Sequence, residues 1–238
     1  MMELERFTYL AVLIFSLSYP LYKSFENKIQ FYRKLKYVLP AILITAVPFL
    51  VWDVIFEKHH IWQFNPDYTL GLNILGLPVE EWLFFFIVPY ACFFLYEVID
   101  FFSHKKVIKY IKPFTIVLAI GLFVISIFKI HLTYTFIVMI SASVMLMIIA
   151  YRQKISPILS KFFKGYFISL LPFFLINGVL TKMPVVLYND AENLSFRIYS
   201  IPVEDMVYLL SLLFINFSIY EILKRNAQRK EAKSANNH

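Results

Sequence analysis

The chain has 238 residues, of which 60% are hydrophobic and only 16% are charged, and its mean hydropathy is +0.66. This composition is too apolar for an ordinary soluble domain and predicts an integral membrane protein. A membrane-spanning helix needs roughly 20 apolar residues, so the chain has room for about seven or eight helices and no large domain outside the membrane. Five glycines and a single cysteine, Cys92, exclude a glycine-rich nucleotide fingerprint, a disulfide framework and a cysteine-based zinc site.

Seven apolar stretches have about the length that a bilayer requires, and they predict an all-α, multi-pass protein of the cell (inner) membrane. They cover residues 7–22, 35–56, 80–102, 111–128, 132–151, 162–181 and 203–223. The first follows Glu3 and Glu5 instead of basic residues, and no small-residue cleavage pattern comes after it. We therefore expect an uncleaved first helix and not a signal peptide.

The basic residues predict which way the helices run. Of the 23 lysines and arginines, 18 lie on one side of the predicted membrane, in the segments 23–36, 105–112, 152–164 and 224–233. The positive-inside rule makes that side cytoplasmic, with the N-terminus outside and the C-terminus inside. Anionic lipid headgroups account for the net charge of +7, so no nucleic-acid partner is expected.

The two halves of the chain repeat one another at a distance of 124 residues, without a gap. Identical pairs are Pro48 and Pro172, Asn65 and Asn189, Pro78-Val79-Glu80 and Pro202-Val203-Glu204, and Tyr96-Glu97 and Tyr220-Glu221. We predict a first three-helix repeat at 1–102, a connector helix at 103–131, a second three-helix repeat at 132–224 and a basic polar tail at 225–238. Because the connector adds one crossing, the two repeats should run parallel, with both Pro-Val-Glu motifs on the outer side.

Each Pro-Val motif is followed by two acidic residues in the first turn of an apolar helix, Glu80-Glu81 in one repeat and Glu204-Asp205 in the other. Proline and a carboxylate at this position also favour helix formation in their own right. Ionisable groups at membrane depth are costly, however, and usually functional. An acidic pair suits proton donation, because like-charge repulsion and desolvation keep one of the two groups protonated. We predict that these four acids are catalytic.

Asp53 is a fifth predicted catalytic residue, and it lies where the second repeat has Asn177. A carboxyl group can share a proton with the acidic pairs, whereas an amide can only form hydrogen bonds, so the repeats should differ chemically. Aromatic side chains surround these positions, and some of their ring faces could stabilise a cation. The predicted substrate-binding residues are Trp52, Trp82, Phe84, Asn177 and Tyr208.

Other polar residues receive structural interpretations. Glu97 and Glu221 lie next to basic loops, and we expect snorkelling salt bridges to residues such as Lys105 or Lys224. The histidines at 59 and 60 match no standard metal-site spacing, so no metal site is predicted.

These motifs resemble those of one known family. The stretch from Pro48 through Trp52-Asp53, Phe64-Asn65-Pro66 and Pro78-Val79-Glu80-Glu81-Trp82 to Tyr96-Glu97 is similar to the small membrane lycopene cyclases, whose subunits or fused halves each carry a Pro-x-Glu-Glu/Asp motif. The second half, with Pro202-Val203-Glu204-Asp205, is similar to the other subunit, so the chain resembles the fused two-repeat form.

This resemblance implies conversion of linear lycopene to a ringed carotenoid, with β-carotene as the expected product, and no net redox change. It implies that the two acidic pairs are the essential acids, and that Pro78, Pro202, Asn65 and Asn189 belong to the motif framework. Lycopene, other carotenoids, the lipid bilayer and other carotenoid-pathway enzymes are the implied partners.

The residues fit that chemistry, since cyclisation needs a general acid, a dry aromatic pocket for the cation and a base. The chain carries no dinucleotide-binding motif, so no cofactor is expected. Two alternatives remain. A small-solute transporter can share the three-plus-one-plus-three plan, although the central parts of these helices hold few polar groups. A carotenoid- or retinoid-binding membrane protein also remains, although residues 203–223 contain no lysine for a Schiff base.

Overall fold

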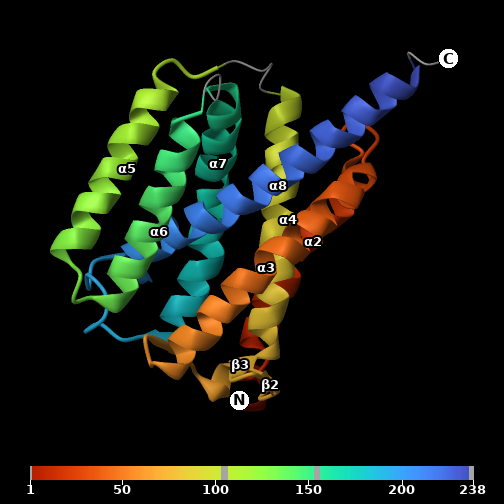
Figure 1. The fold of residues 1–238 in the computed structure, drawn as a ribbon. Helices are drawn as coiled ribbons and strands as arrows, with labels where there is room; N and C mark the ends of the chain where they lie inside the picture. The colour runs from red at the N-terminus through yellow and green to blue at the C-terminus, as the bar shows by residue number, and fades with distance from the viewer. Residues whose placement is uncertain (1, 103–106, 153–155, 236–238) are drawn as a thin grey trace.

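The protein is a bundle of long helices (Figure 1). A computed structural model describes residues 2–102, 107–152 and 156–235. Each of the seven predicted apolar stretches forms one long helix, which confirms that part of the prediction. The long helices are α2 (Thr8–Lys23), α3 (Leu35–Lys58), α4 (Val79–Phe102), α5 (Ile111–Phe128), α6 (Thr133–Ala150), α7 (Ser156–Lys182) and α8 (Val203–Ala235). Short helices α1 (Met2–Glu5), η1 (Phe31–Lys34) and η2 (Pro66–Tyr68) complete the helical elements.

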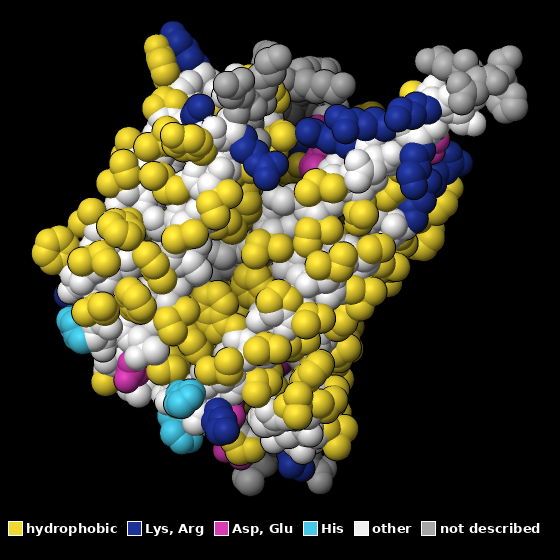
Figure 2. Space-filling model, in the orientation of Figure 1, with side chains coloured by type: hydrophobic (Ala, Val, Ile, Leu, Met, Phe, Trp, Pro, Cys, Tyr) yellow, Lys and Arg dark blue, Asp and Glu magenta, His cyan; other side chains and the backbone are white. Residues whose placement is uncertain are grey.

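Six of the described helices are long and apolar enough to cross a membrane: α3 to α8. The first predicted span, α2, has 16 residues and is shorter than these. Figure 2 shows hydrophobic side chains over most of one face, with lysines and arginines gathered at the end where α8 finishes. A broad apolar belt of this kind suits a hydrocarbon environment and makes the chain a membrane protein.

The fold is mostly helical, as predicted, and the described residues add three antiparallel strand pairs that were not expected from the sequence. They are β1 (Trp62–Phe64) with β4 (Val186–Tyr188), β2 (Asn73–Ile74) with β3 (Leu77–Pro78), and β5 (Arg197–Ile198) with β6 (Ile201–Pro202). Strands of two or three residues are too short to produce a recognisable hydrophobic alternation. In the β2–β3 hairpin, Leu75 and Gly76 both have positive φ, at 54° and 93°, as a two-residue type I′ turn requires.

The β1–β4 pair brings the two halves of the chain together. Trp62 pairs with Tyr188 and Phe64 with Val186, so the segment after α3 lies beside the segment after α7. The loops that lead into the two Pro-Val-Glu motifs therefore lie at the same end of the bundle. Figure 1 places β2 and β3 at this end, opposite the end where α8 finishes.

The segment predicted as a basic polar tail, 225–238, is helical as far as the structure describes it, because α8 continues to Ala235. Its residues are mostly Lys, Arg, Glu, Ala and Gln, all strong helix formers, and no proline or glycine interrupts them. The polar composition was correctly recognised, but it belongs to a solvated extension of the last helix. Two basic loops that support the orientation prediction contain Lys105, Lys106 and Lys154, which lie outside the described residues.

At the end where α8 emerges, the repeats exchange equivalent hydrogen bonds. The Tyr96 hydroxyl donates to Glu221 Oε1 at 3.1 Å, and the Tyr220 hydroxyl donates to Glu97 Oε1 at 2.7 Å. The matched Tyr-Glu dipeptides thus pair across the repeat interface. Gly165 of α7 permits this packing, because a Cβ atom there would lie 2.7 Å from Tyr96 Cδ2.

Glu97 is also the centre of an ion cluster; the predicted salt bridge to Lys224 is confirmed, but the carboxylate lies deeper than the snorkelling interpretation implies. Its side chain is only 1% exposed, and its carboxylate forms ion pairs with Lys34, with Lys161 at 3.7 Å and with Lys224 at 3.2 Å. Lys224 was the partner expected from the sequence. These pairs join η1, α4, α7 and α8, so they fix helices of both repeats at one end of the bundle.

At the opposite end, the first acid of each Pro-Val motif anchors the preceding loop. Glu80 Oε1 accepts the backbone N–H of Leu70 at 2.7 Å, and Glu204 Oε1 accepts that of Leu194 at 2.8 Å. The Thr135 hydroxyl also donates to Glu204 Oε1, at 2.6 Å. Both carboxyl groups are fully buried. Each therefore fixes a ten-residue loop against the start of its own helix.

The close approach at Gly165 makes a testable prediction for the repeat interface. Gly165→Ala should lower the free energy of unfolding by about 1–3 kcal/mol, because the added methyl group overpacks the contact with Tyr96. Gly121→Ala is the matched control, since a Cβ atom at Gly121 meets nothing within 4 Å. We expect a lower thermal midpoint in lipid nanodiscs for the first variant only. Equal midpoints would mean that the interface tolerates the methyl group.

The loop anchor makes a second prediction. Glu80→Leu removes the acceptor of the Leu70 N–H, which should destabilise the loop by about 1–3 kcal/mol and speed amide exchange at Leu70. Glu80→Gln keeps an oxygen at the same position and should preserve the protection. Hydrogen exchange read by mass spectrometry over residues 70–80 measures the difference. Unchanged protection in Glu80→Leu would show that the loop does not depend on this carboxyl group.

Candidate active site

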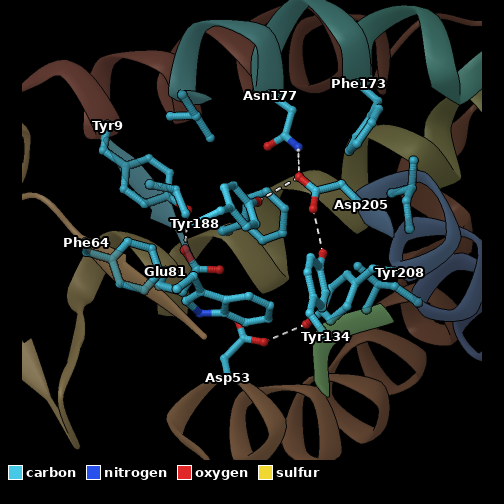
Figure 3. Close-up of a pocket in the computed structure, with 16 residues that line it drawn as sticks. Tyr9, Asp53, Phe64, Glu81, Tyr134, Phe173, Asn177, Tyr188, Asp205 and Tyr208 are labelled. Carbon is cyan, nitrogen blue, oxygen red and sulfur yellow. Dashed lines mark hydrogen bonds between the residues drawn. The ribbon is translucent and has the colours of Figure 1, made fainter. Parts of the chain in front are cut away.

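A small cavity between the repeats collects one acid from each of three helices (Figure 3). Asp53 comes from α3, Glu81 from α4 and Asp205 from α8, and all three are buried. The cavity has a volume of about 60 Å³. Among the described residues that line it there is no lysine, arginine or histidine. The second acids of both Pro-Val motifs thus share one cavity, and no described cation lines it.

Asp205 is surrounded by neutral hydrogen-bond donors. Its Oδ1 accepts the Tyr134 hydroxyl at 2.5 Å, and its Oδ2 accepts the Tyr188 hydroxyl at 2.7 Å and Asn177 Nδ2 at 2.9 Å. Burial and the nearby Asp205 raise the pKa of Tyr188 well above its usual value of 10. The hydroxyl therefore stays protonated and donates a hydrogen bond to Asp205. Three such donors favour the ionised form of a carboxyl group.

Asp53 and Glu81 form a different arrangement, in which the two carboxyl groups interact directly with each other. The Tyr9 hydroxyl donates to Glu81 Oε2 at 2.5 Å, and the Tyr208 hydroxyl donates to Asp53 Oδ1 at 2.7 Å. A hydrogen bond between two carboxyl groups needs a proton on one of them. Because two adjacent negative charges in a buried site without a cation are very costly, this pair is suited to hold a transferable proton.

The structure brings six of the predicted residues to this cavity. They are Asp53, Glu81, Phe84, Asn177, Asp205 and Tyr208. Glu80 and Glu204 do not line it, because their side chains turn toward the loops that they anchor. Trp52 packs on Phe49 and Tyr208 outside the cavity lining. Trp82 donates to the Ile74 carbonyl oxygen at 3.2 Å and does not line the cavity either.

The motif residues that were predicted to be structural all belong to the loop framework. Pro78 lies in β3 and Pro202 in β6, each directly before a long helix. Asn65 and Asn189 each accept a backbone N–H two residues further on, from Asp67 at 3.0 Å and from Ala191 at 3.1 Å. These Asx turns shape equivalent loop positions in the two repeats. Among the described residues, no group of His, Cys, Asp and Glu could hold a metal ion.

Three tyrosines that contact the acids were missed by the sequence analysis. Tyr9 and Tyr134 make the same contact in their repeats, but they lie 125 residues apart and so fall one position outside the 124-residue register. An alignment that allows one gap before the first loop would have paired them. In the 124-residue register Tyr188 corresponds to Phe64, and nothing in that correspondence indicates a hydrogen bond to Asp205.

Comparisons with known proteins agree with this geometry. The family model described as "Lycopene cyclase" matches residues 6–99 and 131–223, which is most of the chain and both repeats. Two fungal proteins described as "Bifunctional lycopene cyclase/phytoene synthase" are each 30% identical to it, from Neurospora crassa over 86 residues (36% of this chain) and from Podospora anserina over 87 residues (37%). Each match covers 13% of the relative's own length. No solved structure matches. The match of the family model to both repeats shows that the chain belongs to the lycopene cyclase family.

Proposed function

We propose that the chain is a lycopene β-cyclase that forms the rings of β-carotene by acid catalysis, without a cofactor and without net oxidation or reduction. The observation that carries this proposal is the shared cavity, in which Asp53, Glu81 and Asp205 lie together without a cation and among aromatic side chains. Residues 1–102 and 132–224 are the two repeats that form the site in this proposal, with 103–131 as the connector.

The proposed reaction conserves atoms and electrons. A proton adds to C2 of the terminal C1=C2 double bond and leaves a cation at C1. The C5=C6 double bond attacks, the C1–C6 bond forms, and the positive charge moves to C5. Loss of the proton from C6 restores the C5=C6 double bond inside the new ring. The protein must therefore supply one proton, stabilise a cation in a dry site and accept one proton.

The three acids match these tasks in different ways. Asp53 and Glu81 line the same cavity without a cation, so together they are suited to hold and donate the first proton. Asp205 accepts hydrogen bonds from Tyr134, Tyr188 and Asn177, and as a carboxylate it can stabilise the cation and take the C6 proton. The donor pair comes from the first repeat and the acceptor from the second. We infer one composite site, at which the two ends of the substrate react in turn.

This division of roles predicts that Glu81→Gln and Asp205→Asn each stop both ring closures. Loss of a general acid or base costs about 10²- to 10⁴-fold in rate. Asp53→Asn should slow the reaction, because the amide cannot share a proton with Glu81. Bacteria that make lycopene would express each variant, and chromatography of the pigments would measure lycopene, the one-ringed product and β-carotene. Asp67→Asn, at an exposed loop carboxyl group, is the control and should keep the wild-type pigment.

Accumulation of the one-ringed product at the wild-type rate in Glu81→Gln or Asp205→Asn would contradict a composite site and favour two independent ones. Wild-type β-carotene in both variants would contradict the proposed chemistry. Lycopene that copurifies with the wild-type chain but is never converted would instead favour a carotenoid-binding protein.

We further propose that the protein lies in the cell (inner) membrane with its N-terminus outside and its C-terminus in the cytoplasm. The basic residues of α8 and the Lys34, Lys161 and Lys224 cluster support this orientation, since all lie at one end of the bundle. A reporter enzyme that works only in the cytoplasm should be active when fused after Ala235. Activity of a periplasmic reporter at the same junction would reverse the orientation and place the acids at the inner face.

A further inference from the structure

A second cavity, formed by α2, α4 and α7, lies next to the acidic one and is almost entirely apolar. We call it the α2–α4–α7 groove. Its volume is about 410 Å³, within the range of about 300–1,000 Å³ that is typical of small-molecule sites. Its walls include Phe15 and Tyr19 from α2, Ala91 and Cys92 from α4, and Leu171 from α7. No charged side chain of the described residues lines it.

The groove and the acidic cavity share part of their walls. Phe84, Phe173, Asn177 and Leu209 line both of them. Asn177 also donates its hydrogen bond to Asp205 from this boundary. Figure 3 shows Phe173 and Asn177 side by side on α7, next to Asp205. An apolar chain lying in the groove would therefore reach the acids at its inner end.

The outer end of the groove opens to the surface of the bundle. Phe15 is 76% exposed, Tyr19 62% and Leu171 69%, and all three are apolar or aromatic residues on membrane-facing helices. Such a rim meets lipid chains and not water when the protein is in a bilayer. A hydrocarbon dissolved in the membrane can thus enter sideways without crossing a polar surface.

The groove at the corresponding place in the second repeat, between α6 and α8, shares no lining residue with the acidic cavity. The 124-residue register replaces Ala91 by Ile215, Ile176 by Trp52 and Leu180 by Phe56. Trp52 and Phe56 pack against each other with ring centroids 5.6 Å apart, and Phe56 is buried. Trp52 and Phe56 of α3 thus stand where α7 has the smaller Ile176, which lines the groove, and Leu180, which lines the acidic cavity. The asymmetry leaves the α2–α4–α7 groove as the route that meets the acids.

We propose that the α2–α4–α7 groove binds the polyene chain of the substrate while one end of that substrate lies against Asp53, Glu81 and Asp205. This inference rests on the proposed function for the identity of the hydrocarbon. The groove holds the unreactive part of a long apolar molecule, and its rim admits that molecule from the bilayer. Phe84 and Phe173 lie between groove and acids, so they must rotate to admit a ring-forming end into a cavity of only about 60 Å³.

The first experiment separates binding from catalysis by using Glu81→Gln as the background. The full chain in phospholipid nanodiscs is equilibrated with lycopene, free pigment is removed, and bound pigment is measured by absorbance. Ala91→Trp fills the groove and should reduce bound lycopene about tenfold, equivalent to about 1.4 kcal/mol. Val144→Trp is the matched control, because it adds the same ring to the open α6–α8 groove on another side of the bundle, where Val144 is 49% exposed. It should bind normally.

A second measurement does not depend on how the tryptophan variants fold. Leu171→Cys in a Cys92→Ser background places the single thiol of the chain on the groove rim, where Leu171 is 69% exposed, so a lipid-soluble maleimide should label it. Saturating lycopene should slow this labelling about tenfold by covering the thiol, and Cys92→Ser provides the blank. A labelling rate that lycopene leaves unchanged would overturn the proposal. Absence of labelling without lycopene would overturn lateral entry through the rim.

The remaining outcomes are equally distinct. Loss of bound pigment in Val144→Trp but not in Ala91→Trp would move the binding site to the α6–α8 groove. Phospholipid in the groove with no bound lycopene would assign it to lipid chains and reject the proposal. If lycopene binds and protects the thiol at the groove rim but the active chain forms no ring, the groove proposal stands and the proposed cyclase activity fails.

Discussion

Three carboxyl groups buried together without a cation set the main constraint on this fold. A buried charge without a partner is very costly, so each carboxyl group must either hold a proton or receive several hydrogen bonds. The helices and strands around the cavity meet this requirement with hydroxyl and amide donors. Tyr9 donates a hydrogen bond to Glu81, and Tyr208 donates one to Asp53. Asp205 accepts hydrogen bonds from Tyr134, Tyr188 and Asn177. Because Tyr208 of the second repeat donates a hydrogen bond to Asp53 of the first, the cavity requires both repeats.

The opposite end of the bundle solves the same problem by charge pairing. Glu97 is as deeply buried as the cavity acids, but three lysines form ion pairs with it. At the same end, Tyr96 and Tyr220 form hydrogen bonds between the two repeats. A carboxylate held by fixed cations stays ionised and has no proton to give. The contrast separates the functions of the two ends. The ion-paired end holds the repeats together, and the cation-free end keeps the groups that can transfer a proton.

The long helices and the acidic centre could be predicted from the sequence because each depends on local pattern. Apolar stretches of about 20 residues define helices regardless of their neighbours. A carboxylate at membrane depth carries a large free-energy cost, so its presence in such a stretch indicates a function. The sequence could not separate Glu80 from Glu81, since adjacent residues on a helix point about 100° apart and only the surrounding loops decide which one meets the cavity. Short strands and the contact of Tyr188 with Asp205 depend on pairing between distant segments, which no local pattern records.

The differences between the repeats follow from a few substitutions within one shared frame. Where the first repeat has Asp53, the second has Asn177, and the amide becomes a fixed donor to Asp205 instead of a proton-sharing partner. Phe64 of the first repeat likewise corresponds to Tyr188 of the second, which adds a further donor to Asp205. Both changes stabilise negative charge on the same carboxyl group and leave the Asp53–Glu81 pair as the place for a proton. A duplicated scaffold thus places three acids with unlike hydrogen-bond partners in one cavity, and the proposed reaction, which adds one proton and removes another, would use that difference.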